Sequence, residues 1–412
     1  MPYIQRVTQV CANSPGAFGA LRIDYEPASI EVNGNDISQD LKMVQPYLDF
    51  YLSRDMVEKT CSTQAKDGAA PKMKRTRSHS VGDLGPSLHF DDEPEDAGIE
   101  YDIDSVLELI EVLESEQRMR KAGGGNLNYS GVRLPHGADA VVHVQSGATF
   151  PVHRVVLASR SQVLENIFSG SKLQVGDQQQ HHSNNINNIN NNTNVRLLSA
   201  RPGPGLGVST VARLEISGCH PLSVLILLRY LYSDELLAVW DRRVGVSRIT
   251  KRLARVDANP VRVKAELQAL ATVLGLPTLA HALEAPGKRE PAPSMAEDMG
   301  RLFDVVQSTT AATTTTTTMA SKTTRPLTPD VVLQLADREV YCHSVILRAR
   351  SPLFAGFFDL EDWTAKRWDA DGRVRVDMKH FGWHVMRFVV RFMCCGADKE
   401  MFYVLGVFRN YF

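Results

Sequence analysis

Short apolar runs alternate with polar turns along this chain, and one such pattern occurs twice. Residues 139–168 read DAVVHVQSGATFPVHRVVLASRSQVLENIF, and residues 330–358 read DVVLQLADREVYCHSVILRARSPLFAGFF. In both copies a Val-rich run predicts a strand, a turn with a second short run completes a hairpin, and two apolar helical runs follow. A serine lies eight residues after His153 in the first copy and eight after His343 in the second. A match of this length within one chain predicts a duplicated domain.

The alternation of apolar and polar residues predicts specific strand pairs and a specific core. The expected strand pairs are Ala140–Val144 with Thr149–Val152, and Val331–Leu335 with the run that ends at Tyr341. The helical residues expected in the core are Leu157, Leu164, Phe168, Leu347, Phe354 and Phe358. We also expect Leu225 and Leu228, in a later apolar helix, to pack against the first of these sets.

Further elements follow each hairpin. Val211–Ile216 and Val374–Met378 predict a third strand, whereas Pro221–Ser233 and Trp383–Met393 predict an apolar helix at the centre of each copy. Leu267–Leu283 predicts a final helical hairpin in the first copy, and no counterpart follows the second. The two copies therefore share a hairpin, two helices, a strand and a core helix.

This order of elements resembles the BTB/POZ domain, in which an aspartate opens the first strand and a histidine follows the hairpin. The resemblance implies an α+β fold, with two BTB/POZ domains that each combine a short mixed sheet with a helical cluster. The low-complexity composition, including the tract Thr309–Thr318, leads us to expect that disordered linkers join the two domains.

The amino-terminal residues 1–32 contain a strand-like run and a turn with Gly16 and Gly19. They resemble the closing strands of a propeller of the regulator-of-chromosome-condensation type. A propeller followed by two BTB domains is the order of the inhibitor of Bruton tyrosine kinase family, which implies that the chain is part of a longer protein. An ordinary disordered amino terminus with one hairpin is the alternative. The apolar closing residues 401–412 lead us to expect a truncated second domain with an exposed patch.

These patterns predict five segments. They are 1–32, a possible propeller remnant; 33–131, helices and a polar linker; 132–286, the first BTB/POZ domain, with a disordered insertion at about 171–208; 287–326, a linker that could be partly helical after Pro293; and 327–412, the second BTB/POZ domain. Within the second segment, Asp36–Leu52 predicts a helix that Pro46 should kink. Ile103–Met119 predicts another helix, which we expect to dock on the first domain or on the propeller.

Three stretches are expected to lack regular structure and to be cut first by proteases: Lys66–Asp96, Val175–Gly207 and Ser308–Lys322. The first contains Arg75-Thr76-Arg77-Ser78-His79-Ser80, whose two arginines upstream of a serine suit basophilic kinases. Ser80 is therefore a candidate phosphorylation site, although the same basic run could also act as a nuclear import signal.

Charge and cysteine content narrow the classes of partner and the compartment. The net charge of −1 argues against nucleic acid or an anionic membrane as a partner, and no apolar run is long enough to span a bilayer. The six cysteines show no C-x-x-C spacing, as expected of free thiols in a reducing compartment. We therefore expect a soluble protein of the cytoplasm, the nucleus or both.

A search for chemistry finds no catalytic motif, so we expect no enzymatic activity, no cofactor and no metal. His153 and His343 stand where a strand gives way to a helix, and only Cys342 beside His343 could join either as a metal ligand. Adjacent strand residues point to opposite faces, so that pair is a poor chelate. Both histidines are interpreted as packed structural side chains.

The resemblance to BTB/POZ domains implies a protein-interaction adaptor, in which an aspartate and a cation face each other in a charged pocket of dimeric members. At the matching positions stand Asp139 and Arg154 in the first copy. In the second copy Asp330 faces Ser344, so we expect that pocket to have lost its cation and Asp330 to lack such a partner.

The resemblance also implies docking on a cullin scaffold, so that an unknown substrate is presented to a ubiquitin ligase. The matching face in the first copy comprises Leu228, Tyr230, Tyr232, Asp234 and Glu235, and in the second it spans about 391–396. The alternative is a homotypic BTB scaffold or a transcription-linked interaction protein that binds no ligase. Pairing of two chains as a BTB homodimer and pairing of the two domains within one chain both remain open.

Overall fold

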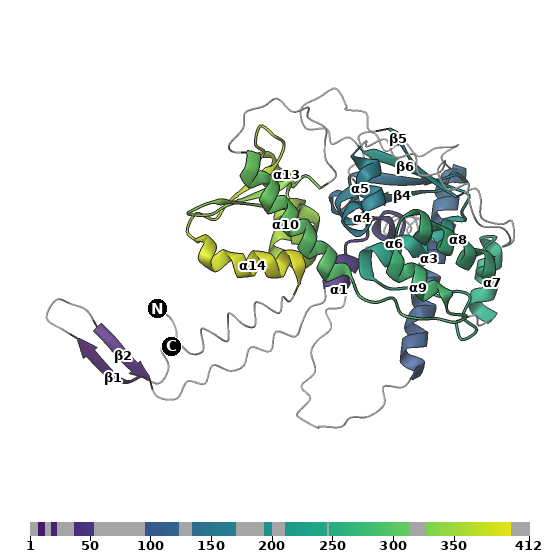
Figure 1. Cartoon of the computed structure of the whole chain (residues 1–412), viewed down its shortest axis with the longest axis horizontal. Coiled ribbons are helices and arrows are strands. Elements are labelled where there is room, and N and C mark those ends of the chain that lie inside the picture. Colours follow the sequence, from purple (N-terminus) through teal and green to yellow (C-terminus); the bar gives the residue numbers. More distant parts are fainter. Residues whose placement is uncertain are drawn as a thin grey trace, which may run out of the picture. The chain divides into compact units, whose positions relative to one another are not determined.

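The structure is a computed structural model. It describes residues 7–12, 18–22, 37–52, 95–122, 134–169, 193–199, 211–244, 247–313 and 327–396. The chain divides into two compact units, Met1–Asn35 and Asp36–Phe412. In the first unit, β1 (Val7–Ala12) and β2 (Phe18–Arg22) form one antiparallel hairpin (Figure 1). This agrees with the predicted strands, but a lone hairpin gives no support for a propeller.

The first domain of the second unit is built on a sheet of four strands in the order β4-β3-β6-β5. The strands are β3 (Ala140–Val144), β4 (Thr149–Val152), β5 (Asn194–Ser199) and β6 (Ala212–Ser217). The hairpin of β3 and β4 is antiparallel and β6 runs parallel to β3, with Ala140 opposite Ala212. The predicted hairpin pairing is confirmed.

The helices of the first domain cluster beside this sheet (Figure 1). They are η1 (Pro135–Gly137), α4 (Arg154–Arg160), α5 (Gln162–Phe168), α6 (Pro221–Ser233), α7 (Ser247–Arg255), α8 (Pro260–Val273) and α9 (Pro277–Glu284). Leu157, Leu164 and Leu225 are buried in one core, as predicted. The helix α6 has no exposed side, because α8, α4 and two helices from outside the domain pack around it.

The second domain repeats this arrangement with fewer elements. Its sheet has the order β8-β7-β9, and its strands are β7 (Val331–Gln334), β8 (Glu339–Cys342) and β9 (Val374–Asp377). Its helices are α11 (Ser344–Arg350), α12 (Pro352–Asp359), α13 (Glu361–Ala365) and α14 (Trp383–Cys395). Leu347, Phe354 and Phe358 are buried, which confirms the predicted core.

Two helical segments that precede the first domain pack on it. They are α1 (Ile37–Lys42), followed after a turn by the helical residues 46–52, and α3 (Glu95–Ala122). The break before Pro46 is the predicted kink. Both α1 and α3 contact α6, so the expected docking on the first domain is confirmed.

Three stretches expected to be irregular contain regular structure. The strand β5 lies inside the expected insertion, because its backbone pairs with the free edge of β6. The helix α10 (Met295–Thr313) is the helix expected after Pro293. Its apolar side up to Val306 is buried, and the helix runs past Ser308 into a stretch expected to be irregular. The helix α3 begins at Glu95, within the expected irregular stretch 66–96. Within these stretches, residues 66–94, 171–192, 200–208 and 314–322 lie outside the described part of the chain.

No helix among the described residues is long and apolar enough to cross a membrane.

Candidate interaction site

The charged pocket of the first domain has the expected geometry. Arg154 Nε donates to Asp139 Oδ2 at 2.7 Å, and the backbone N–H of Arg154 donates to Asp139 Oδ1 at 2.8 Å. The two side chains are 16% and 29% exposed, so the ion pair is partly shielded from water. One carboxylate therefore holds the start of α4 against the start of β3.

In the second domain Asp330 faces Ser344, as expected, and bonds to that residue rather than to a cation. The backbone N–H of Ser344 donates to Asp330 Oδ1 at 2.7 Å, and the Ser344 hydroxyl donates to the other carboxylate oxygen. A serine reaches the carboxylate because it stands at the position that Arg154 occupies in the first domain. The cation is lost, but the link between helix and strand is kept.

Paired substitutions test what the cation adds. We expect Arg154→Ala to lower the free energy of unfolding by about 1–2 kcal/mol, because a partly shielded ion pair lies between the exposed and the buried limits. Ser344→Ala should cost less, because it removes a hydroxyl and no charge. Urea titration measures both, and sedimentation velocity shows whether either variant changes self-association. Equal and negligible effects would contradict a role for the Arg154 charge.

His153 and His343 each connect the start of the first helix to the segment that precedes the first strand of their domain. His153 is buried, and burial lowers its pKa to about 4, so its ring is neutral near pH 7. Nε2–H then donates to the His136 carbonyl at 3.1 Å, and Nδ1 accepts from the Tyr232 hydroxyl at 2.9 Å. His343 likewise reaches the Leu327 carbonyl at 3.2 Å. In the first domain, this network uses Tyr232, a residue of the expected cullin face.

The expected cullin face is not an exposed surface, so that expectation is corrected. Leu228, Tyr230 and Tyr232 are each at most 1% exposed, because helices surround α6. Asp234 accepts from the backbone N–H groups of Ser294 and Met295 and pairs with a buried arginine on α4. These residues join parts of the chain to one another.

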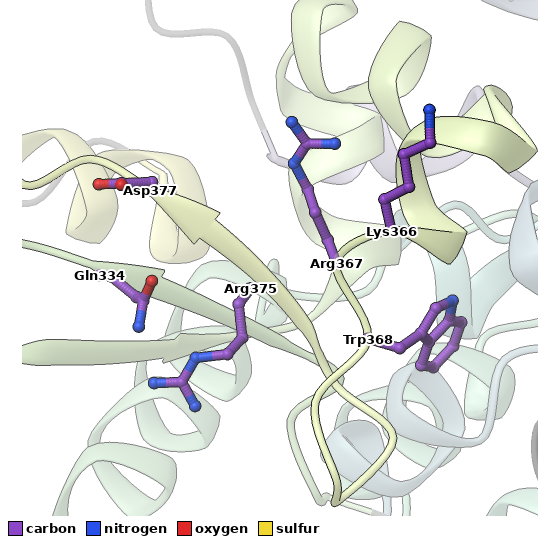
Figure 2. Close-up of a pocket in the computed structure, with 6 residues that line it drawn as sticks. All are labelled: Gln334, Lys366, Arg367, Trp368, Arg375 and Asp377. Atoms are coloured by element: carbon purple, nitrogen blue, oxygen red, sulfur yellow. The ribbon is translucent and has the colours of Figure 1, made fainter.

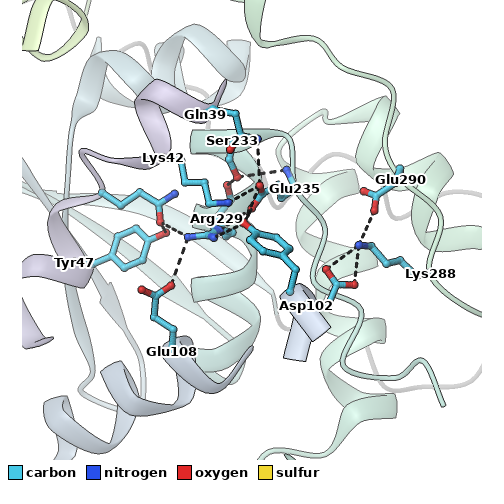
Figure 3. A network of polar contacts seen from close by, with 12 residues as sticks. Gln39, Lys42, Tyr47, Asp102, Glu108, Arg229, Ser233, Glu235, Lys288 and Glu290 are labelled. Carbon is cyan, nitrogen blue, oxygen red and sulfur yellow. Dashed lines mark hydrogen bonds and ion pairs between the residues drawn. The ribbon is translucent and has the colours of Figure 1, made fainter. Parts of the chain in front are cut away.

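Glu235 is the centre of a second internal network (Figure 3). Its carboxylate pairs with Lys42 on α1 at 2.7 Å and with Arg229 on α6 at 3.0 Å, and it accepts from the Tyr101 hydroxyl on α3 at 3.1 Å. Arg229 also contacts Glu108 of α3 at 3.7 Å. The network therefore binds α1 and α3 to the end of the core helix.

Burial dominates the electrostatics of this network. It lowers the pKa of the Lys42 ammonium, although the Glu235 carboxylate favours the charged form. It raises the pKa of Asp102, whose carboxylate pairs with Lys288 at 2.7 Å. Removing one partner of such a buried ion pair would leave the other charge uncompensated and would destabilise the fold.

The two domains contact each other through the helices that precede them. The helix α1 precedes the first domain and packs on α6 of that domain and on α11 of the second. The helix α10 precedes the second domain and packs on α14 of that domain and on α4 of the first. Each preceding helix therefore contacts its own core helix and the first helix of the other domain.

An ion pair crosses at each of these two contacts. Arg160, the last residue of α4, pairs with Asp298 on α10, and Arg350, the last residue of α11, pairs with Asp40 on α1. The arginine side chains are 1% and 2% exposed. Their guanidinium groups lie over the rings of Tyr230 and Phe392, at 5.4 Å and 4.7 Å. The pairing of the domains is thus nearly twofold symmetric.

Sequence reasoning missed this second repeat, although a signal was present. Residues 37–44 read ISQDLKMV and residues 295–302 read MAEDMGRL, so an aspartate and three apolar residues recur at the same spacing. The apolar residues are Ile37, Leu41 and Val44 in one helix and Met295, Met299 and Leu302 in the other, and all are buried. Only eight residues are involved, with few identities, so the match is visible only once both helices are known to pack alike.

The remaining predictions concern metal binding, the phosphorylation site and the expected cullin face of the second domain. Within the described residues, no group of His, Cys, Asp or Glu side chains is placed to hold a metal ion. Ser80 lies outside the described part of the chain. In the second domain Cys394 and Cys395, at the end of α14, are buried. The expected face at 391–396 adjoins α10, since Arg391 pairs with Asp304 and the Cys395 thiol lies 3.9 Å from the Met299 carbonyl.

Comparison with known proteins agrees with the fold. The BTB/POZ domain family matches residues 132–200 and 321–402. The chain is also similar to BTB/POZ domain-containing protein 1 of Schizosaccharomyces pombe (strain 972), with 22% identity over 399 residues. The match covers 97% of this chain and 23% of the relative, so the chain spans about a quarter of the relative's length.

The first matched segment contains β3, β4, β5, α4 and α5, and the second contains the whole sheet β8-β7-β9 with α11 to α14. Each domain has the parallel pairing of the first and third strands, the buried histidine and the serine that caps the second helix. The likeness to the propeller and to the inhibitor of Bruton tyrosine kinase family receives no support from these comparisons. This chain is a protein with two BTB/POZ domains, and the domains are paired with each other.

Proposed function

We propose that this chain is a protein-interaction adaptor that serves as a substrate receptor of a cullin ubiquitin ligase. The observation that carries the proposal is the exchange of α1 and α10 between the two domains. BTB/POZ domains are interaction modules, and here the helix that precedes each domain covers the first helix of the other domain. The faces of α4 and α11 are thus already occupied within the chain. Only the other surfaces of the two domains can bind a different protein.

The same exchange counts against the homotypic scaffold. A second copy of the chain would have to displace α10 from α4 or α1 from α11 before it could pair there. Displacement would also break the ion pairs Arg160–Asp298 and Arg350–Asp40, whose arginines are nearly inaccessible to water. Removing one partner from such a pair costs about 3–5 kcal/mol.

The outer side of α14 is the face that we propose for the cullin. In the first domain the equivalent side of α6 is covered by α8, where Ser223 donates to Glu266 at 2.6 Å. In the second domain no described helix takes that place, and Val385 and Val389 are 48% and 46% exposed. Ser223 and Val385 are each the third residue of a 13-residue core helix. A helix of a cullin scaffold would bury these two valines, as α8 buries the equivalent side of α6 in the first domain.

Size-exclusion chromatography with light scattering, with and without a purified cullin amino-terminal domain, tests the proposal. We expect a monomer of 45.7 kDa and a complex of one chain with one cullin domain. Val385→Asp with Val389→Asp should weaken the complex at least about tenfold, because two valines would no longer be buried. Val261→Asp is the matched control, since Val261 is 76% exposed on α8 of the first domain. A chain that dimerises and binds no cullin would favour the homotypic scaffold.

A further inference from the structure

The third strands of the two domains are equivalent, but only one of them has a strand on its outer edge. In the first domain Ala212 of β6 lies opposite Ala140 of β3. In the second domain Val374 of β9 lies opposite Val331 of β7, and both strand pairs are parallel. The outer edge of β6 pairs with the antiparallel strand β5. In the described part of the second domain, β9 is the last strand of its sheet.

The beginning of that open edge is already covered. The backbone N–H of Arg375 donates to the Arg367 carbonyl at 2.9 Å, and that of Asp369 donates to the Arg373 carbonyl at 2.8 Å. The segment 367–369 therefore folds back along the first residues of β9. Beyond Arg375 this segment turns away toward α13.

The rest of the edge presents backbone groups outward. The N–H groups of Val374 and Met378 donate to the carbonyls of Asp330 and Gln334, on the side of β7. Because backbone groups alternate in direction along a strand, the carbonyl of Arg375 and the N–H of Asp377 point to the other side. No described strand pairs with them, so this stretch can accept an added strand.

A pocket lies where the open edge meets the covered one (Figure 2). Its volume is about 440 Å³, and it is lined by Gln334, Lys366, Arg367, Trp368, Arg375 and Asp377. Trp368 is 54% exposed. Figure 2 shows Lys366, Arg367 and Trp368 on the segment beside the strand that carries Arg375 and Asp377.

The charges of the pocket favour an acidic ligand. Three of the lining side chains are cations and one, Asp377, is an anion. Arg375 is paired with Glu339 and Asp369, and Arg367 lies over the Trp363 ring at 4.2 Å. The side chain of Lys366 is exposed and makes no hydrogen bond or ion pair with another described residue. Its charge is the one most available to a partner.

We propose that the open edge of β9 binds an extended acidic segment of a partner protein as an added antiparallel strand. The strand β5 sets the direction, since Asn194 lies opposite Ser217 and Ser199 opposite Arg213 at the matching edge. If the added strand runs antiparallel to β9, as β5 runs antiparallel to β6, its carboxyl-terminal end reaches Arg375, Lys366 and Trp368. Acidic residues are therefore expected at that end, and main-chain hydrogen bonds supply the rest of the affinity. This site does not depend on whether a cullin binds α14.

Two fluorescein-labelled, amidated peptides probe the edge of the full chain by fluorescence anisotropy. One has the sequence of β5, Asn-Val-Arg-Leu-Leu-Ser, and the other ends in two glutamates, Asn-Val-Arg-Leu-Glu-Glu. We expect the acidic peptide to bind several times more tightly than the β5 peptide, whose arginine gives it a positive charge. No binding of either peptide, or tighter binding of the β5 peptide, would overturn the proposal.

Two variants test separately how the backbone hydrogen bonds and the charge of Lys366 contribute to peptide affinity. Asp377→Pro removes the outward N–H at the end of an edge strand, where proline is tolerated, and should weaken the acidic peptide at least about fivefold. Lys366→Glu should weaken it by about fivefold, whereas Lys251→Glu, the same change at an exposed site on α7, should leave binding unchanged. Equal affinity of the wild type and Asp377→Pro would contradict strand addition.

Amide hydrogen exchange of the full chain distinguishes a partner from another part of the same chain. We expect the Asp377 amide to exchange rapidly in the free protein and at least about tenfold more slowly when the acidic peptide is saturating. Protection of this amide in the free protein would mean that the chain itself occupies the edge, and would overturn the proposal.

Discussion

Arg160→Ala is expected to lower the free energy of unfolding by about 3–5 kcal/mol. The guanidinium group of Arg160 contacts Asp234 and Asp298 and donates to the Ser294 hydroxyl at 2.8 Å. The carboxylates are only 9% and 18% exposed, so neither could regain full hydration after the cation is removed. Urea titration followed by circular dichroism measures the change. Small-angle scattering of the variant would then show whether the two domains have separated.

Arg301→Ala is the matched control for this experiment. Arg301 also bonds to Asp298, at 3.1 Å, but its side chain is 58% exposed. We therefore expect a loss below about 1 kcal/mol, as for other exposed pairs. If Arg160→Ala were no more costly than Arg301→Ala, the cation of Arg160 would not hold the two domains together.

Leu225→Ala is expected to cost about 2–5 kcal/mol, because it removes a fully buried side chain from the core helix of the first domain. The helix α6 is enclosed by α1, α3, α4 and α8, so its surroundings have little freedom to collapse into the cavity. Thermal and urea unfolding of the variant both measure the loss.

The second domain provides a control at the same helix position. Arg387 is the fifth residue of α14, as Leu225 is the fifth residue of α6, and it is exposed. Arg387→Ala should therefore change stability by less than about 0.5 kcal/mol. A loss below 1 kcal/mol for Leu225→Ala would mean that the core of the first domain can repack around the smaller side chain.

These two core helices illustrate why repeated sequence does not give repeated burial. Both have 13 residues, but every residue of α6 after the first is buried, whereas α14 buries only Met386, Val390, Cys394 and Cys395. The difference depends on α3 and α8, which cover α6 and have no described counterpart on α14. The expected cullin face was derived from α6 as if its end were exposed, and these covering helices are the reason that it is not.

Local pattern was sufficient to predict the repeated unit of this protein. Alternation of apolar residues selected the strand register, as in Ala140 opposite Val152, because a shift by one residue would turn the apolar side chains to the solvent. The resemblance to BTB/POZ domains implied the ion pair of Asp139 and Arg154, and the two residues meet because a hairpin returns the chain to its starting end. Such contacts follow from short sequence separations.

The pairing of the domains and the addition of β5 could not be predicted in the same way. Asp40 and Arg350 form an ion pair although they are 310 residues apart in sequence, and either could have remained on a solvated surface. Whether an apolar helix face packs on its own domain, on the other domain or on a partner depends on which complementary faces meet. Folding of the whole chain decides this, because burial is favourable against any apolar surface and only shape and charge select among them.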